Sequence, residues 1–179
     1  EMMLMDFGIR WMTMHADITR SFPVSGKFNP MQKMLYEIVL KGQREVEKAA
    51  RAGVTIDELN NVCWAVINDG LEKKFVAAGG KYELRYKDRP HGVSHLMGEQ
   101  EHDGDPFRNY LKQPMMPGWM ISNEPGLYGE FKIRLDGKTY DETIGIRIED
   151  NLVMTQKGCM NLSNIIPKSV RAIEKLMKG

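Results

Sequence analysis

The sequence predicts a single α+β domain over residues 1–179. Apolar residues recur at helical spacing between residues 30 and 70, whereas the stretches on either side favour extended strands. With 179 residues, 42% of them hydrophobic, the chain can bury one core. The 25 Lys and Arg residues nearly balance the 24 Asp and Glu residues, and a net charge of +1 argues against nucleic acid as a partner.

We expect a β-ribbon followed by two helices in the first half of the chain. Residues 2–7 and 9–14 favour strands, with Gly8 as a turn or bulge between them. An Asn-Pro pair, typical of a helix start, opens a helix over 30–52. A Thr-x-x-Glu capping box then opens a second helix over 56–70. Their apolar stripes predict that the two helices pack together.

The second half is predicted to be rich in loops and strands. Residues 79–117 lack periodicity and gather Gly, Pro and charged residues, which indicates loops around short extended pieces. Strand patterns return at 119–123 and 130–135, and isoleucines occupy every second position over 144–148. A final helix is expected over 164–177, with a proline near its first turn.

The sequence shows no sign of export or membrane insertion. No apolar run approaches the roughly 18 to 20 residues that a membrane span needs. Cys63 and Cys159 form neither a disulfide framework nor a metal-type pair, which indicates reduced thiols and a cytoplasmic location. The first residues are apolar and strand-like. We therefore expect the chain to be the inside of a longer protein, with an unpaired first strand exposing Met2, Leu4 and Phe7.

Three of the four histidines lie in one short glycine-containing stretch. His91, His95 and His102 are close enough in sequence to converge on one site. Imidazole is a frequent metal ligand and the usual acid or base near neutral pH. Each histidine taken singly fits a structural role with satisfied hydrogen bonds, but the cluster favours a functional site.

Four acids occur where strands usually avoid them. Asp6 and Asp17 lie inside apolar runs, Glu124 ends a strand, and Glu149 is expected within another strand. Each alone fits a solvated edge. If the four converged, each pair at about 4 Å would repel by roughly 4 kcal/mol at an effective dielectric near 20. Two divalent cations would balance this charge, and an oxygen-rich set with His95 suits Mn²⁺ better than structural Zn²⁺.

Five motifs in order resemble the signatures of the pita-bread metallopeptidases, a group that includes methionine aminopeptidase, prolidase, aminopeptidase P and the metal-free creatinase. The motifs are Asp6-Phe7-Gly8, Asp17 to Pro23, His91 to Asp103, Glu124 to Tyr128, and Gly145 to Asp150. The second and third are most similar to aminopeptidase P. The resemblance implies a pita-bread fold, a mostly antiparallel curved sheet flanked by helices, of which the opening helices and strand are missing here.

The resemblance also implies a metal site. In it Asp6 binds one ion, Asp17 and Glu149 bridge both ions, and His95 and Glu124 complete the second. The cofactors would be two divalent ions, Mn first, with Co, Fe or Zn as the other candidates. All five ligand positions are filled, which argues against a metal-free, creatinase-like site.

The implied reaction is hydrolysis of the bond between an N-terminal residue and a following proline, by a metal-bridged hydroxide. His91 and His102 would lie beside the substrate, with His102 donating to the developing oxyanion. Glu124 would shuttle a proton to the leaving nitrogen, and Arg147 would orient acids or line the pocket. The expected partners are a peptide with proline in second position and, in the full-length protein, further copies of itself.

Three alternatives remain open. Prolidase, a dipeptidase, shares the ligands, but Ser94 is more typical of aminopeptidase P than the Gly of prolidase. A non-catalytic pita-bread scaffold is the second, although such relatives typically lose ligands. The third is a nucleic-acid module that uses a basic run, which is more typical of a solvated face. That run comprises Lys73, Lys74, Lys81, Arg85, Lys87 and Arg89.

Overall fold

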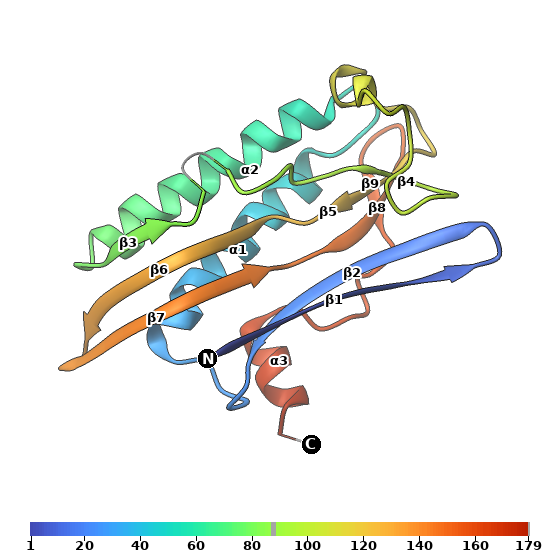
Figure 1. Ribbon diagram of the computed structural model, residues 1–179. Coiled ribbons are helices and arrows are strands. Elements are labelled where there is room, and N and C mark those ends of the chain that lie inside the picture. Colours follow the sequence, from blue (N-terminus) through green and yellow to red (C-terminus); the bar gives the residue numbers. More distant parts are fainter. Residues whose placement is uncertain (87–88, 179) are drawn as a thin grey trace.

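The computed structural model describes residues 1–86 and 89–178. It consists of antiparallel strands and helices (Figure 1). The α+β prediction is confirmed. The elements in order are β1 (Met2–Trp11), β2 (Met14–Pro23), α1 (Pro30–Ala49), α2 (Ile56–Gly70), a π-helical turn (Leu71–Val76), β3 (Lys81–Leu84), β4 (Leu96–Met97), a 3-10 helix (Asn109–Lys112), β5 (Met120–Asn123), β6 (Gly126–Leu135), β7 (Lys138–Arg147), β8 (Asp150–Met154), β9 (Cys159–Asn161) and α3 (Val170–Leu176). Lys87, part of the basic run, lies outside the described residues.

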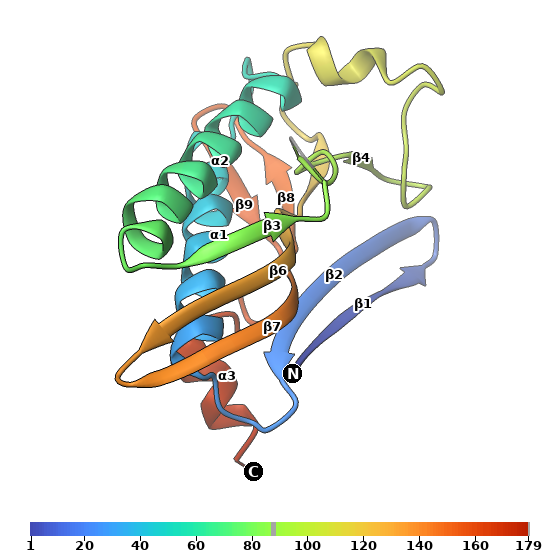
Figure 2. The ribbon, with the colours of Figure 1, turned by 60° about the vertical axis from the view of Figure 1, so that its left-hand side comes forward.

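The strands form three antiparallel groups within the described ranges. β1 pairs with β2, β6 lies between β3 and β7, and the third sheet has the order β4-β5-β8-β9. Figure 2 shows α1 and α2 on one side of these sheets and the β1–β2 hairpin on the other. The helices thus cover one face of the sheets, and the core lies between them.

Both predicted helices are present and share one core. Asn29 caps α1 by accepting from the Gln32 backbone N–H at 2.9 Å, and Thr55 caps α2 through its box with Glu58. The α1 helix ends at Ala49, three residues before the predicted end, and α2 continues into the π-helical turn. The core between helices and sheets is built from fully buried apolar side chains. They include Leu35, Val39, Leu59, Ile67, Phe131, Ile144, Ile146 and Ile148.

The expected turn or bulge at Gly8 is wrong. β1 runs unbroken through Gly8, which pairs in register with Asp17, and the chain reverses instead at Met12 and Thr13. A β-carbon at position 8 would lie 1.9 Å from the carbonyl oxygen of Ala16. Glycine is therefore needed here for close backbone approach, not for a turn.

The last helix is shorter than predicted. It begins at Val170 with Ser169 as its cap, whereas the pattern indicated a start near residue 164. The backbone just before it is used in tertiary contacts, because Tyr36 donates to the carbonyl of Lys168 at 2.9 Å. β3 and β4 are the short extended pieces expected within residues 79–117, whereas β8 and β9 were missed, and β6 and β7 are longer than expected.

One face of β1 is apolar and exposed. The side chains at every second position are 46% to 73% exposed, namely Met3, Met5, Phe7, Ile9 and Trp11. Phe7 was expected to be exposed, but Met2 and Leu4 face the other way and are half-buried. This stripe lies on the side of the hairpin opposite to Asp6, because strand residues alternate between faces.

Both cysteines carry free thiols; Cys63 is buried and Cys159 half-buried. Among residues 1–86 and 89–178, no helix combines the length and the apolar content that crossing a membrane requires.

Candidate metal centre

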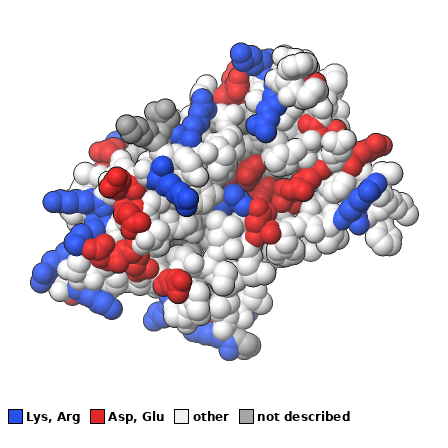
Figure 3. Space-filling model, viewed as in Figure 1, with Lys and Arg blue, Asp and Glu red and all other residues white. Residues whose placement is uncertain are grey.

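The five predicted ligands come from five different segments and line one cavity of about 320 Å³. Acidic side chains gather in a band between the hairpin and the loop after β4 (Figure 3). β1 supplies Asp6 and β2 supplies Asp17, His95 directly precedes β4, and Glu124 directly follows β5. Glu149 was expected within a strand, but it lies in the two-residue link between β7 and β8. These two strands belong to different sheets, and the chain crosses between them at this point.

The ligand atoms fall into groups whose members lie within 4.8 Å of one another. One group is His95, Glu124 and Glu149, and a second is Asp6, Asp17 and Glu149. Glu149 belongs to both, as a bridging ligand would. A third group joins Asp17 and His95 to His102, which was not predicted as a ligand.

The His95 ring is held in the tautomer that a metal ligand needs. Its Nδ1 lies 3.2 Å from the carbonyl oxygen of Leu96, so this nitrogen carries the proton. The lone pair of Nε2 then faces two acids, at 3.3 Å from Glu124 Oε1 and 3.8 Å from Asp17 Oδ2. Burial lowers the pKa of His95 to about 4, so the ring is neutral near pH 7.

The buried acids of the cavity hold protons at unusually high pH. Burial, followed by the carboxylates of Asp6 and Glu101, raises the pKa of Asp17 to about 7. Burial raises the pKa of Glu124 to about 7 against the opposing effect of Arg147. For Glu149, burial and then Glu124 raise the pKa to about 8. Such shifts are expected where acids crowd together without a compensating cation.

The donor set fits divalent cations. Glu149 Oε1 is buried and has no hydrogen-bond partner in the described part of the chain, while its Oε2 accepts from the Thr19 hydroxyl at 2.7 Å. A buried carboxylate oxygen without a partner is costly. Together with the neutral Nε2 of His95, it provides ligand atoms that a hard cation would satisfy. Carboxylate oxygens with one imidazole suit Mn²⁺ and similar ions.

His91 and His102 both line the cavity. The ring nitrogens of His91 contact the Gly92 carbonyl oxygen at 2.8 Å and the Tyr128 hydroxyl at 3.1 Å, and burial lowers the pKa of His91. His102 is exposed, and its ring centroid lies 4.1 Å from that of His95, with the two rings tilted by 37°. Both rings therefore reach the space beside the predicted ligands.

Arg147 also lines the cavity and contacts one of the predicted ligands. Its Nη2 forms an ion pair with Asp6 Oδ2, and its Nε donates to the Thr19 hydroxyl at 3.0 Å. An ion bound by Asp6 would compete with this ion pair.

Several residues at the site were not found from the sequence. Glu101 and Arg108 line the cavity from loops, where no periodic pattern marks them. Asn151 holds Asp17 by accepting from its backbone N–H at 3.2 Å and donating to its carbonyl at 2.6 Å. Thr19 could have been found, because it is two residues from Asp17 in β2 and must share its face.

Comparison with known proteins places the chain in a family. The model of metallopeptidase family M24 matches residues 1–156. The chain belongs to metallopeptidase family M24. Members of this family include metal-dependent peptidases, in agreement with the cavity described above.

The relatives include named aminopeptidases. The chain is 34% identical to the Xaa-Pro aminopeptidase of Escherichia coli, over 99% of this chain and 41% of that protein. It is 32% identical to "Intermediate cleaving peptidase 55, mitochondrial" of Arabidopsis thaliana, over 100% of this chain and 35% of that protein. The solved structure of zinc-substituted E. coli aminopeptidase P with product superposes with a TM-score of 0.81 at 31% identity, covering 99% of this chain and 41% of that one. The chain thus spans about 40% of the length of these relatives.

Proposed function

We propose that the protein is an aminopeptidase that removes an N-terminal residue from a peptide with proline in second position. The convergence of Asp6, Asp17, His95, Glu124 and Glu149 on one cavity is the main support. The similarity to the E. coli Xaa-Pro aminopeptidase over 99% of the chain supports the choice of substrate. Manganese as the metal, a homo-oligomer and a cytoplasmic location stay predictions.

Different residues of the cavity can serve different steps of peptide hydrolysis. Two divalent ions held by the five ligands would supply positive charge at the scissile carbonyl and lower the pKa of a water. Glu124, whose carboxylate lines the cavity, would take up a proton from that water and pass it to the leaving nitrogen. His102, exposed at the cavity, can donate to the carbonyl oxygen as negative charge develops there.

The test is a peptidase assay on the full-length protein loaded with Mn²⁺. Two tripeptides are compared, identical except for proline or alanine in second position. We expect release of the N-terminal residue from the proline peptide, preferred by about 10-fold or more. Asp17→Asn should abolish this release. Asp136→Asn should not, because Asp136 is exposed in the β6–β7 turn, where its positive φ of 50° is one that Asn also tolerates.

An Xaa-Pro dipeptide, added to the assay as a third substrate, distinguishes the other candidate activities. A prolidase would cleave an Xaa-Pro dipeptide and leave the tripeptide intact. A non-catalytic scaffold would release no amino acid from any peptide. Preference for the alanine peptide would overturn the Xaa-Pro specificity.

A further inference from the structure

The hairpin that carries Asp6 and Asp17 is attached to the Glu149 segment mainly by side chains. Within the described ranges β1 and β2 pair only with each other, so no shared sheet fixes Asp17 relative to Glu149. One backbone hydrogen bond joins β2 to the link, from the Glu149 N–H to the Thr19 carbonyl at 3.0 Å. The spacing of these two acids therefore depends on side chains: Thr19 and Asn151 act at the cavity, and Arg20 acts beneath it.

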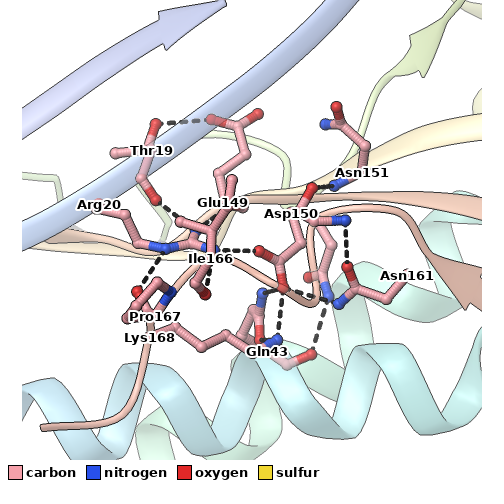
Figure 4. Close-up of polar contacts among 12 residues, drawn as sticks. Thr19, Arg20, Gln43, Glu149, Asp150, Asn151, Asn161, Ile166, Pro167 and Lys168 are labelled. Atoms are coloured by element: carbon pink, nitrogen blue, oxygen red, sulfur yellow. Dashed lines mark hydrogen bonds and ion pairs between the residues drawn. The ribbon is translucent and has the colours of Figure 1, made fainter. Parts of the chain in front are cut away.

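Arg20 is the central one of these side chains. It lies on the face of β2 opposite to Asp17 and Thr19, pointing away from the cavity (Figure 4). A guanidinium has five N–H donors, and all five are used. Their acceptors are the carbonyl oxygens of Thr19, Glu149, Ile166 and Pro167 and the Oδ1 of Asp150. Arg20 thus ties β2 to the Glu149 backbone and both to residues 166–167.

Asp150 holds Arg20 from the other side and is itself fully buried. Its Oδ2 accepts from Gln43 at 2.9 Å, from Asn161 at 2.8 Å and from the ammonium of Lys168. Lys168 also reaches Gln43 Oε1 at 3.0 Å and Glu47 Oε2 at 3.3 Å. Its three donors therefore have three acceptors on two other segments.

The charges of this group balance. Two cations, Arg20 and Lys168, face two anions, Asp150 and Glu47. A buried charge that loses its partner is strongly destabilising, and the surrounding structure moves to satisfy it. Removing the Lys168 charge would leave Asp150 short of a donor directly next to Glu149.

We propose that Lys168 is a positioning residue for the metal centre. Lys168 completes the set of donors around Asp150. Asp150 then orients Arg20, and Arg20 sets the distance between β2 and Glu149. Lys168, like residues 166 and 167, lies beyond the residues 1–156 that the family model matches. The inference rests on the metal centre proposed above, and it predicts that a segment outside the cavity controls metal affinity.

The test measures binding of Mn²⁺ alone to the metal-free protein by calorimetry, without any peptide. Lys168→Met is expected to lower the affinity about 10-fold, the low end of the range for direct partners of metal ligands, because Lys168 acts through Asp150 and Arg20. Lys168→Arg keeps the charge and should recover most of the loss. Lys175→Met is the matched control, because Lys175 is exposed on α3 and its loss should leave the affinity unchanged. Thermal unfolding of each metal-free variant sets a titration temperature at which it is folded.

A second variant covers the case in which Lys168→Met does not fold. Asn161→Ala removes one neutral donor from Asp150 and should lower the Mn²⁺ affinity in the same direction. Wild-type affinity in a folded Lys168→Met or Asn161→Ala protein would overturn the positioning role and leave the metal centre standing. An equal loss in Lys175→Met would overturn it too, because the effect would then be one of net charge. Failure of the wild-type protein to bind Mn²⁺ would overturn the metal centre and this inference together.

Discussion

Without bound cations, the buried acids of the cavity keep their protons up to about neutral pH. The neutral ring of His95 turns its lone pair toward Glu124 and Asp17, and the two acids and Glu149 have raised pKa values. Each of these residues is also a plausible ligand for a hard divalent ion. Metal binding and deprotonation are therefore linked at this site.

The raised pKa values predict the pH dependence of stability. The ordinary values are 3.8 for Asp and 4.5 for Glu, and the folded values are about 7 for Asp17 and Glu124 and about 8 for Glu149. The metal-free native state thus binds protons that the unfolded state releases, so its stability should fall as pH rises from about 4 to about 8. Urea unfolding at pH 5.5 and pH 8.5 measures this, and Mn²⁺ should restore stability at the higher pH. Glu149→Gln removes one titrating group and should flatten the dependence; a metal-free protein more stable at pH 8.5 would contradict the assignment.

His102 is expected to act on the transition state. Because its donor is needed once the carbonyl oxygen gains charge, His102→Ala should lower kcat by about 10² to 10³ and change KM little. His15→Ala is the control, since His15 lies in β2 outside the residues that line the cavity. Steady-state kinetics on the proline tripeptide decide it. A raised KM with unchanged kcat would place His102 in ground-state binding.

At the scale of elements, the sequence predicted best what local chemistry determines. An Asn-Pro start, a capping box and apolar spacing located α1 and α2 to within a few residues, and the alternation of isoleucines identified the buried face of β7. The final helix starts late because the carbonyls of residues 166 and 167 accept from Arg20, more than 140 residues away. Contacts of that separation leave no periodic mark in the sequence.

The role of Gly8 also depends on a contact that the sequence does not reveal, and this contact predicts the effect of a substitution. Its need for close approach to Ala16 is visible only when β1 and β2 are paired. Gly8→Ala should destabilise the protein by about 1 to 3 kcal/mol, the usual range for overpacking. It should also weaken Mn²⁺ binding, because it forces apart the strands that hold Asp6 and Asp17.

Gly158→Ala is the matched control for this substitution. Position 158 has an ordinary φ, and a β-carbon there would meet nothing within 4 Å. Urea unfolding and calorimetry compare the two variants. Equal stability of Gly8→Ala and wild type would show that the hairpin relaxes at no cost.

At the scale of the whole molecule, the site is assembled from segments spread along the chain from Asp6 to Glu149. The acids were identified because charged residues inside apolar strand patterns are unusual, and the histidines because they cluster. Glu101 and Arg108 sit in loops without a pattern, and the contacts of Arg20 and Asp150 join distant segments. Such residues are found only when the fold brings them together.

The exposed face of β1 predicts self-association of the 179-residue chain when it is made alone. Its apolar stripe, and an edge that pairs with no strand among the described residues, offer a surface for another strand. Light scattering over a concentration series should show growing particles, and the double variant Ile9→Lys/Trp11→Lys should shift the chain toward monomer. Val24→Lys changes an exposed apolar residue outside β1 and should have no such effect. A wild-type chain that stays monomeric at all concentrations would refute the prediction.

Anomalous X-ray diffraction at the manganese edge, on crystals grown with Mn²⁺, tests the metal centre most directly. Two peaks are predicted in the cavity, both beside Glu149. One should be shared with Asp6 and the other with His95 and Glu124, while Asp17 should lie beside both as the second predicted bridging ligand. No peak in the cavity, or manganese bound only elsewhere on the protein, would contradict the assignment of these five residues as metal ligands.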